Sequence, residues 1–262
     1  MKDRHRIIGQ PPQETPPTRA NSAAFTTKGP VRDINADAYV KDDAAGFYAI
    51  ADGVGSLPAS AAASRFATKE ALRLFLARRW HDAGAACDLQ RLIGDVAAGF
   101  RTHFSAEGTP STTLTLAVLR GLHLSYASVG DAPVILLSGG TATLLTRDHT
   151  IADRGRLFCS YDAVKTLGGS NVLFTSIGPF PPQVTCYPSL ECPPGSRLLL
   201  CSDGLFQFLT QDDLAKLSAN CASSTEFVGA IRRLSATSRA RDNVSLILIN
   251  LPGTETGHAA MP

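Results

Sequence analysis

The sequence predicts an α+β fold in which two packed antiparallel β-sheets are flanked by pairs of α-helices, a four-layer αββα sandwich. The first observation behind this prediction is the order of the patterns: strands, two helices, strands, then two helices and a last strand. The second is that neighbouring strand patterns are joined by short turns such as Arg120-Gly121 and Ser138-Gly139-Gly140. Such short turns favour antiparallel pairing over crossover connections.

Three short strands and two long helices are predicted in the first part of the chain. The strands are Ala24–Thr27, Ala38–Lys41 and Phe47–Ala51. A helix from Pro58 to about Trp80 begins with proline in its first turn, where the missing N–H has no helical partner to lose. A second helix, about Asp88–Phe104, begins at a capping Asp. Two consecutive long helices are expected to pack on one face of a sheet.

The rest of the chain repeats this order. The predicted strands are Ser111–Arg120, Leu122–Val129, Val134–Leu137, Thr143–Thr146, Val184–Leu190, Arg197–Cys201 and Val244–Leu251, and the predicted helices are Gln211–Asn220, after Thr210, and about Thr225–Arg239. Ser223 and Glu226 have the spacing of a capping box at the start of the last helix. No element is predicted over residues 149–178.

Composition narrows the classes of protein to consider. The 262 residues carry 25 basic and 23 acidic side chains, so a net charge of +2 gives no reason to expect a nucleic-acid or membrane partner. The longest uncharged run, Thr166–Leu190, contains too many prolines for a spanning helix. The six cysteines are scattered, which indicates buried thiols. The amino terminus lacks the apolar core of a signal peptide, so we expect a cytoplasmic protein.

A single folded domain is expected over residues 21–251. Proline-rich and polar stretches at residues 1–20 and 252–262 read as flexible tails. No linker or internal repeat interrupts the patterns between them. We therefore expect all the chemistry of the chain to belong to this one domain.

Four aspartates share one sequence context. Asp52, Asp131 and Asp203 each end or follow a strand-like run and adjoin a glycine, and Asp242 precedes the last strand. Any one of these Asp-Gly pairs is more simply read as a turn. Strand ends that meet at one edge of a sandwich would bring all four together, and gathered carboxylates need a cation to neutralise them. Mg²⁺ and Mn²⁺ prefer such oxygen ligands, and Arg32 offers a planar fork for phosphate oxygens.

Other sites that these patterns could indicate are weaker. Gly53-Val54-Gly55 has Pro58 at the third glycine position of a dinucleotide fingerprint. A calcium loop beginning at Asp33 would need a glycine where Ala38 stands. His149 could act as an acid or a base, but a histidine bonded to the backbone of a turn is the simpler interpretation.

Taken in order, seven segments resemble the metal-dependent type 2C (PPM) protein Ser/Thr phosphatases, and in particular their bacterial single-domain members. They are GPVRDINADAY (29–39), FYAIADGVGS (47–56), GTPSTTLTL (108–116), SYASVGDAPVILL (125–137), LTRDHT (145–150), RLLLCSDGLFQFL (197–209) and RDNVSLILI (241–249). The resemblance implies the αββα fold and hydrolysis of phosphoserine and phosphothreonine by a hydroxide that bridges two Mn²⁺ or Mg²⁺ ions.

The resemblance also implies a role for individual residues. Arg32 matches the arginine that holds the substrate phosphate. Asp52 matches the carboxylate that bridges the two core ions, and the carbonyl of Gly53 matches a further ligand. Asp203 and Asp242 match the remaining ligands of the first ion, and Asp131 with Asp203 matches the site of a possible third ion. The implied partners are a phosphorylated protein and an opposing Ser/Thr kinase, with the enzyme acting as a monomer.

The chain departs from the family pattern at the second ion. The usual Glu-Asp pair is Ala36-Asp37 here, so one carboxylate ligand is lost, and Asp37, or Asn35 through water, would have to compensate. Val54 stands where animal and plant members carry a histidine, which bacterial members commonly lack. An alternative function is therefore a pseudophosphatase, a regulatory module that binds phosphoproteins without hydrolysing them. The survival of Arg32 and the other acids favours the enzyme.

Overall fold

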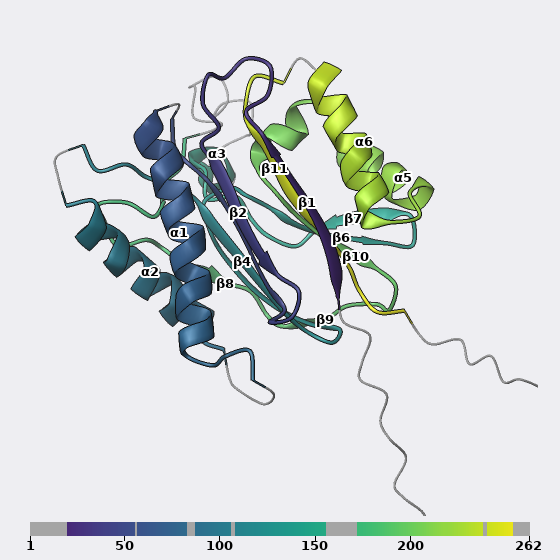
Figure 1. The fold of residues 1–262 in the computed structure, drawn as a ribbon, viewed down its shortest axis with the longest axis horizontal. Coiled ribbons are helices and arrows are strands. Elements are labelled where there is room, and N and C mark those ends of the chain that lie inside the picture. The colour runs from purple at the N-terminus through teal and green to yellow at the C-terminus, as the bar shows by residue number, and fades with distance from the viewer. Residues whose placement is uncertain are drawn as a thin grey trace, which may run out of the picture.

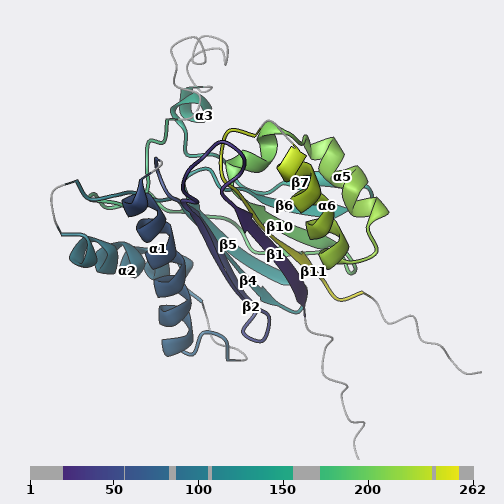
Figure 2. The same cartoon turned by 45° about the horizontal axis from the view of Figure 1, so that its top comes forward.

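The strands form two antiparallel sheets that pack face to face, and a pair of helices covers each outer face. The computed structural model describes residues 20–55, 57–82, 87–105, 108–155, 172–237 and 240–253. Figure 1 shows the two helix pairs on opposite sides of the molecule, and the turned view in Figure 2 separates the four layers. The predicted fold class is confirmed. The predicted tails lie almost entirely outside the described residues.

The first sheet contains the two ends of the domain. In spatial order its strands are β1 (Asn21–Thr27), β11 (Val244–Asn250), β10 (Arg197–Cys201), β6 (Val134–Ser138) and β7 (Thr141–Leu144). Its outer face is covered by α5 (Gln211–Asn220) and α6 (Ser224–Thr237). The last strand in the sequence thus lies between the first strand and β10.

The second sheet is built from the middle of the chain. In spatial order its strands are β2 (Asp37–Asp42), β3 (Phe47–Asp52), β4 (Leu114–Arg120), β5 (His123–Val129) and β8 (Thr185–Cys186), with β9 (Leu190–Glu191) also paired to β5. Its outer face is covered by α1 (Pro58–Ala77) and α2 (Leu89–His103), as the sequence predicts for two consecutive helices.

Alternation along the strands divides the core into three layers. In β3, Phe47, Ala49 and Ala51 face α1 and α2, whereas Tyr48 and Ile50 face the other sheet. The same period of two recurs in the first sheet, so each central strand is apolar on both faces. This explains why the central strands read as continuous apolar runs in the sequence.

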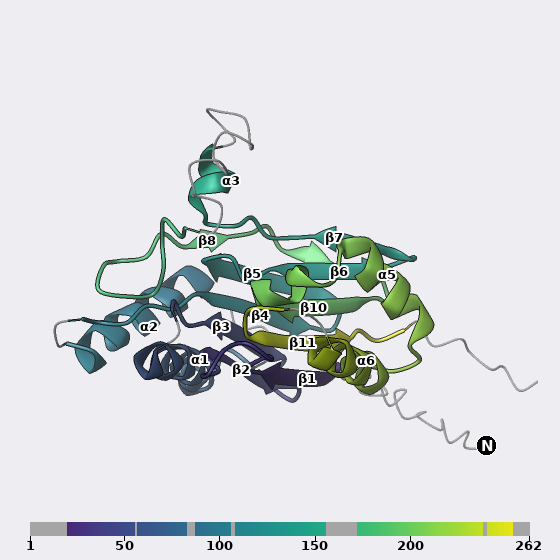
Figure 3. The same cartoon turned by 90° about the horizontal axis from the view of Figure 1, so that it is seen from above.

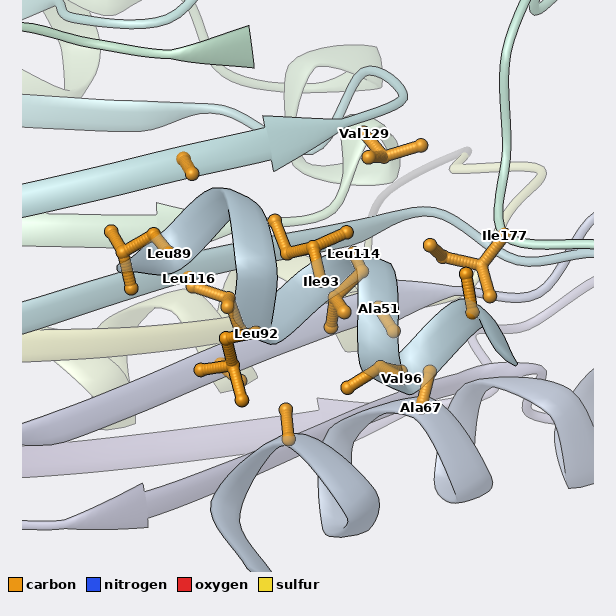
Figure 4. Packing of buried hydrophobic residues seen from close by; sticks show 14 of the residues in the cluster. Ala51, Ala67, Leu89, Leu92, Ile93, Val96, Leu114, Leu116, Val129 and Ile177 are labelled. Atoms are coloured by element: carbon orange, nitrogen blue, oxygen red, sulfur yellow. The ribbon is translucent and has the colours of Figure 1, made fainter. Parts of the chain in front are cut away.

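The core layer beneath α1 and α2 extends to the end of the sheet that carries the aspartates. Figure 4 shows Ala51, Leu114 and Val129 in this layer, packed with Leu92 and Ile93 of α2 and other apolar side chains. Ala51 directly precedes Asp52, and Val129 lies two residues before Asp131. The backbone that presents these acids is therefore anchored by buried side chains.

The predicted helix starts are confirmed. Asp88 Oδ1 accepts a hydrogen bond from the N–H of Arg91 at 2.9 Å, as expected of an N-cap. At the start of α6, Ser223 Oγ accepts from the N–H of Glu226 at 3.1 Å. The Glu226 carboxylate accepts from the N–H of Ala222, one residue before the position that a complete capping box would use.

Several predicted strands were wrong in extent. The strand predicted at Thr143–Thr146 is shifted to Thr141–Leu144, and the strand predicted at Ala24–Thr27 begins at Asn21. Val184–Leu190 is not one strand but the two short strands β8 and β9, because Pro188 between them has no N–H to donate to a ladder. The ring of Tyr187 stacks on that of Tyr126 there, with centroids 4.9 Å apart. Residues 111–113 precede β4, and Thr112 instead bridges two separate segments, at Gly53 and Ile177.

Two short helices have no counterpart in the sequence prediction. They are α3 (Ile151–Gly155) and the 3₁₀ helix η1 (Asp203–Gln207). Figure 3 shows that α3 stands outside the four layers. Among the described residues, no helix is both long and apolar enough to cross a membrane.

Packing beneath the outer helices predicts that two phenylalanines contribute very differently to the free energy of unfolding. Phe100 of α2 is fully buried, whereas Phe180 is 78% exposed. We expect Phe100→Ala to lower the free energy of unfolding by about 3–5 kcal/mol, because it leaves a cavity. Phe180→Ala, the control, should change it by less than about 0.5 kcal/mol. Urea denaturation followed by circular dichroism measures both, and equal effects would contradict the assigned layers.

Candidate functional site

The predicted site residues gather at one end of the sandwich. In an antiparallel sheet the end of one strand lies beside the start of its neighbour, and Asp52 at the end of β3 is paired with Asp37 at the start of β2. The same end of the other sheet carries Thr27 opposite Val244 and Cys201 opposite Leu246. Arg32, Asp203 and Asp242 follow or precede these positions, so the loops from both sheets meet there. Asp131 reaches this end from the loop between β5 and β6.

Asp52 is held through its backbone by two threonines. Its N–H donates to Thr113 Oγ1 at 2.8 Å, and its carbonyl accepts from the N–H of Thr113 and the hydroxyl of Thr112. From the sequence, these threonines are predicted only as strand residues. The structure shows that they fix the backbone of Asp52, so that its side chain is free to face the other acids.

Gly53 lies where no side chain could fit. Its N–H donates to the carbonyl of Ala36 at 3.1 Å. A Cβ at this position would lie 2.3 Å from the carbonyl oxygen of Ser60 and 2.8 Å from that of Ala36. The glycine therefore permits β2, β3 and the start of α1 to close around the site.

Asp37 is buried, and only one of its two carboxylate oxygens has a hydrogen-bond partner among the described residues. Oδ2 accepts from the hydroxyl of Ser202 at 2.8 Å, and Ser202 Oγ in turn accepts from the N–H of Ser245 at 3.0 Å. Oδ1 is buried and has no hydrogen-bond partner among the described residues. A buried carboxylate oxygen without a partner is costly unless a ligand satisfies it.

Arg32 and Asp242 form an ion pair, with Nη2 and Oδ2 2.8 Å apart. The loop that carries Arg32 is held by Asn243, whose Oδ1 accepts from the N–H of Ala36 at 2.8 Å. Its Nδ2 donates to the carbonyls of Lys28 and Ile34. From the sequence, Asn243 has no predicted role, and only its place directly after Asp242 could have indicated one.

Asp131 is placed by a turn that His149 stabilises. Nδ1 of His149 accepts a hydrogen bond from the backbone N–H of Gly130 at 3.1 Å, and the backbone N–H of His149 donates to the carbonyl of Gly130. With Nδ1 an acceptor, Nε2 carries the proton and donates to Thr185 Oγ1 at 2.8 Å. Gly130 itself has a φ of +106° and lies against Thr113. The interpretation of His149 as a backbone-bonded turn residue is confirmed.

The carboxylates raise one another's pKa. Burial, together with the negative charges of Asp203 and Asp242, raises the pKa of Asp37 to about 7, although the nearby hydroxyls of Ser245 and Ser202 oppose the rise. Burial and the charge of Asp37, followed by those of the other acids, raise the pKa of Asp52 well above its usual range. The acids are therefore close enough to repel each other, and a bound cation would relieve that repulsion.

The pKa values of the remaining acids move in the same direction. Burial raises the pKa of Asp131 to about 7, with Asp203 and Asp148 adding to the rise. Burial and the charge of Asp242 raise the pKa of Asp203. The raised pKa values of Asp131 and Asp203 show that these two acids belong to the same cluster of mutually repelling carboxylates as Asp37 and Asp52. The cluster therefore reaches the loop between β5 and β6.

The donor set fits hard divalent cations. Asp203 Oδ1, like Asp37 Oδ1, is buried without a hydrogen-bond partner among the described residues. In the described part of the chain, no group of three or more His, Cys, Asp or Glu side chains is arranged so that it could hold a metal ion as it stands. The side chains would therefore supply few direct ligands. Mg²⁺ and Mn²⁺ suit such a site because they keep several waters and bind few carboxylates.

The structure distinguishes Asp37 from Asn35, the two residues that could replace the carboxylate ligand missing at Ala36. Ala36 itself is buried, with 2% of its surface exposed. Asn35 turns away from the acids, because its Nδ2 donates to Thr26 Oγ1 at 2.7 Å and its Oδ1 accepts from the N–H of Asp37 at 3.2 Å. Asp37 interacts with the other acids and has an unsatisfied oxygen. Asp37 is therefore the better candidate.

The family model that matches this chain, and the related sequences and solved structures compared with it, are those of protein phosphatases. A family model described as Protein phosphatase 2C matches residues 27–245. The chain is 29% identical over 213 residues to "Probable protein phosphatase 2C 5" of Arabidopsis thaliana, covering 68% of this chain and 48% of that protein. It is 25% identical over 258 residues to a "Putative protein phosphatase" of Mycoplasma genitalium, covering 88% and 96%. The chain spans about half the length of the plant relatives it matches.

Solved structures share the fold. The serine/threonine phosphatase PstP/Ppp of Mycobacterium tuberculosis superposes with a TM-score of 0.77 at 22% identity, covering 90% of this chain and 100% of that chain. MsPP of Mycobacterium smegmatis, solved with cacodylate, gives 0.74 at 24% identity, covering 88% and 98%. The PstP catalytic domain in complex with two manganese ions gives 0.70 at 23% identity, covering 89% and 99%.

The raised pKa values predict how a metal ion should stabilise the protein. A carboxyl with a raised pKa favours the fold while protonated, so this contribution is present below about pH 4, the usual pKa, and lost as the pH rises through about 7. Mn²⁺ replaces these protons. We expect millimolar Mn²⁺ to raise the melting temperature more at pH 8 than at pH 5.5, measured by scanning fluorimetry.

The control for this experiment is the exposed acid Glu191, which lies on β9. Asp203→Asn should diminish the Mn²⁺-dependent shift, whereas Glu191→Gln should retain it. An equal shift at both pH values, or the same shift in Asp203→Asn as in the wild type, would contradict the assignment of these carboxyls to an ion site.

Proposed function

The chain belongs to the protein phosphatase 2C family, and we propose that it is a metal-dependent protein phosphatase that hydrolyses phosphoserine and phosphothreonine. One observation carries the proposal: loops from both sheets bring Arg32 and the aspartates together at one end of the sandwich. Their charges are complementary to a phosphate held between an arginine and divalent cations.

We assign Asp37, Asp52, Asp203 and Asp242, with the carbonyl of Gly53, to two core ions. Asp131 with Asp203 would hold a third. The support for this assignment is the mutual repulsion of the carboxyls and the two buried, unpartnered oxygens of Asp37 and Asp203. When bound, Mn²⁺ or Mg²⁺ supplies Lewis acidity and a water nucleophile that is deprotonated at neutral pH.

Arg32 is proposed to orient the phosphate. Its guanidinium neutralises Asp242 at 2.8 Å, and its side chain keeps 35% of its surface exposed, so it is accessible to a ligand. Asn243 restrains the loop from Lys28 to Ala36 at three points and so limits how far Arg32 can move. A planar guanidinium fixed in this way can present two N–H groups to phosphate oxygens.

Several finer points rest on the family and on composition. We propose a phosphorylated protein as the substrate, which implies an opposing Ser/Thr kinase. Manganese is favoured as one physiological ion because a related fold has been solved with two manganese ions. We further propose that residues 21–251 are the catalytic domain, and that it acts as a monomer in the cytoplasm.

The pseudophosphatase alternative rests only on Ala36. It is disfavoured because Arg32 and the acids at Asp52, Asp203 and Asp242 are present and lie at the same end of the fold. A site that had lost its function would have no reason to keep several mutually repelling carboxyls, since burying them costs stability.

Activity tests the proposal directly. The wild type should hydrolyse p-nitrophenyl phosphate with Mn²⁺ and stop when a chelator is added. Asp203→Asn should lower kcat by roughly 100-fold or more, because it removes charge from the ion site. Glu191→Gln is the matched control and should retain wild-type kcat. Folded wild-type protein without turnover at millimolar Mn²⁺ would refute the enzyme.

A second substitution tests the departure at Ala36. If the second ion site is merely weakened, Ala36→Glu should lower the Mn²⁺ concentration required for half-maximal activity, because a carboxylate ligand is restored. Ala36→Gln, which adds the same bulk without charge, is the control. Because Ala36 is buried, the melting temperature of both variants must be measured alongside. An unchanged Mn²⁺ requirement in folded Ala36→Glu would show that position 36 is not a ligand position here.

A further inference from the structure

Two cysteines that are far apart in the sequence are brought to the same place by the fold. The cysteines that the structure describes are all free thiols, and three of them, Cys192, Cys201 and Cys221, are buried. Cys87 is half-buried and Cys186 is exposed. Cys87 directly precedes Asp88, the N-cap of α2, and Cys186 is the second of the two residues of β8. Because α2 packs against β8, the two accessible thiols flank one contact between elements.

The register of the sheet directs the side chain of Cys186 toward α2. Cys186 lies opposite Ala127 on β5, and paired residues of neighbouring strands point their side chains to the same face. Ala127 belongs to the core layer beneath α1 and α2. Leu116, which lies opposite Ala127 on β4, and Leu89 of α2 belong to the same layer, as Figure 4 shows. The thiol of Cys186 therefore faces the side of the sheet that α2 covers.

Cys87 packs on the same layer from the helix side. Val184, two residues before Cys186, also packs there. Burial raises the pKa of the Cys87 thiol to about 11; Arg120 opposes this rise, whereas Asp88 and the neighbouring Cys186 add to it. Burial and the charge of Asp88 raise the pKa of Cys186 as well. Register, packing and charge thus agree that both thiols lie beside the start of α2.

The strand that carries Cys186 is able to move slightly toward α2. β8 contains only two residues and lies at the edge of its sheet. A short edge strand loses little pairing when it shifts. A disulfide requires Cα atoms about 4.4–6.8 Å apart. Since the two elements already pack against each other, only a small adjustment is needed to reach this separation.

We propose that Cys87 and Cys186 are a redox-reactive pair, which a peroxide converts to a disulfide that ties β8 to the start of α2. Cys186 is the thiol that the peroxide reaches first, because it is exposed, and Cys87 is the thiol that resolves the oxidised product. Burial keeps both thiols largely protonated at neutral pH, so the pair stays reduced until such an oxidant is present.

The reaction proceeds in two balanced steps. The thiolate of Cys186 attacks one oxygen of the peroxide, so that an S–O bond forms, the O–O bond breaks, and the departing hydroxide takes up a proton as water. The sulfur of Cys87, having lost its proton, then attacks the sulfenic sulfur of Cys186. An S–S bond forms, the S–O bond breaks, and a second water leaves. The two thiols lose two electrons, and the peroxide accepts them.

The disulfide would lie next to a support of the candidate ion site. Thr185, the other residue of β8, forms a hydrogen bond with Nε2 of His149 at 2.8 Å. His149 in turn holds the backbone of Gly130, directly before Asp131. A bond at Cys186 would therefore restrain the strand one residue away from this support. Its formation does not depend on the proposed phosphatase activity.

Peptide mapping after oxidation tests the pair. The reduced full chain is treated with hydrogen peroxide, quenched with catalase, unfolded in N-ethylmaleimide and digested without reductant for mass spectrometry. We expect one linked peptide pair that contains Cys87 and Cys186. A link from Cys186 to another cysteine or to a second chain overturns the proposal, and so does a Cys186 that is unmodified or carries only a sulfinic acid.

Two variants serve as matched controls. Cys87→Ser should abolish the linked peptides, and its Cys186 should instead be found as a sulfenic or sulfinic acid. Cys159→Ser should retain the link, because this cysteine has no part in the pair. Loss of the link in a folded Cys159→Ser variant, verified by circular dichroism, would contradict the assignment of Cys87 as the partner.

Thermal unfolding shows whether the disulfide fits the native fold. The link closes a loop of about 100 residues, so the oxidised wild type should melt about 5 °C or more above the reduced protein in scanning fluorimetry. Cys87→Ser treated in the same way should show no rise. An unchanged or lowered melting temperature in the linked wild type would show that the bond formed outside the native arrangement, and would overturn the proposal.

Discussion

The structure depends on holding mutually repelling carboxylates together at one end of two packed sheets. Burial and the charges of neighbouring carboxylates raise the pKa of Asp37 and Asp131 to about 7, so their ionised forms oppose the fold at neutral pH. The opposing contribution comes from the apolar layers that continue up to the site, where Ala51, Leu114 and Val129 are fully buried. The acids can be placed so closely because the strands that present them are anchored by packing that does not involve the acids.

Hydrogen bonds to the backbone complete this placement. Thr113 fixes Asp52, His149 fixes the turn before Asp131, and Asn243 fixes the loop that carries Arg32. Each of these side chains lies in a different segment of the chain from the residue that it holds. The site is thus supported by a layer of neutral polar residues, which orient the charged groups without adding to their repulsion.

Sequence patterns predicted most of the fold because local signals agreed with tertiary packing. Apolar runs located the central strands, and Asp88 and Thr210 located helix starts, since each of these signals acts within a few residues. The acids were recognised because each ends or precedes a strand next to a distinctive neighbour. The roles of Asn243 and Thr113 were not predicted, because their partners are distant in sequence and no local pattern encodes them. The short helix η1 escaped for a related reason: it holds only about one turn and has no period to detect.

The position of β11 has a consequence for how the protein comes into being. This last strand is inserted between β1 and β10, and the residues just before it, Asp242 and Asn243, pair with Arg32 and hold its loop. A nascent chain on the ribosome therefore has neither a complete first sheet nor a restrained Arg32 loop until residue 250 has emerged. The long sequence separation of these contacts favours slow folding. Activity would thus appear only when synthesis of the domain is finished, and a chain cut short before Val244 should be inactive from the start.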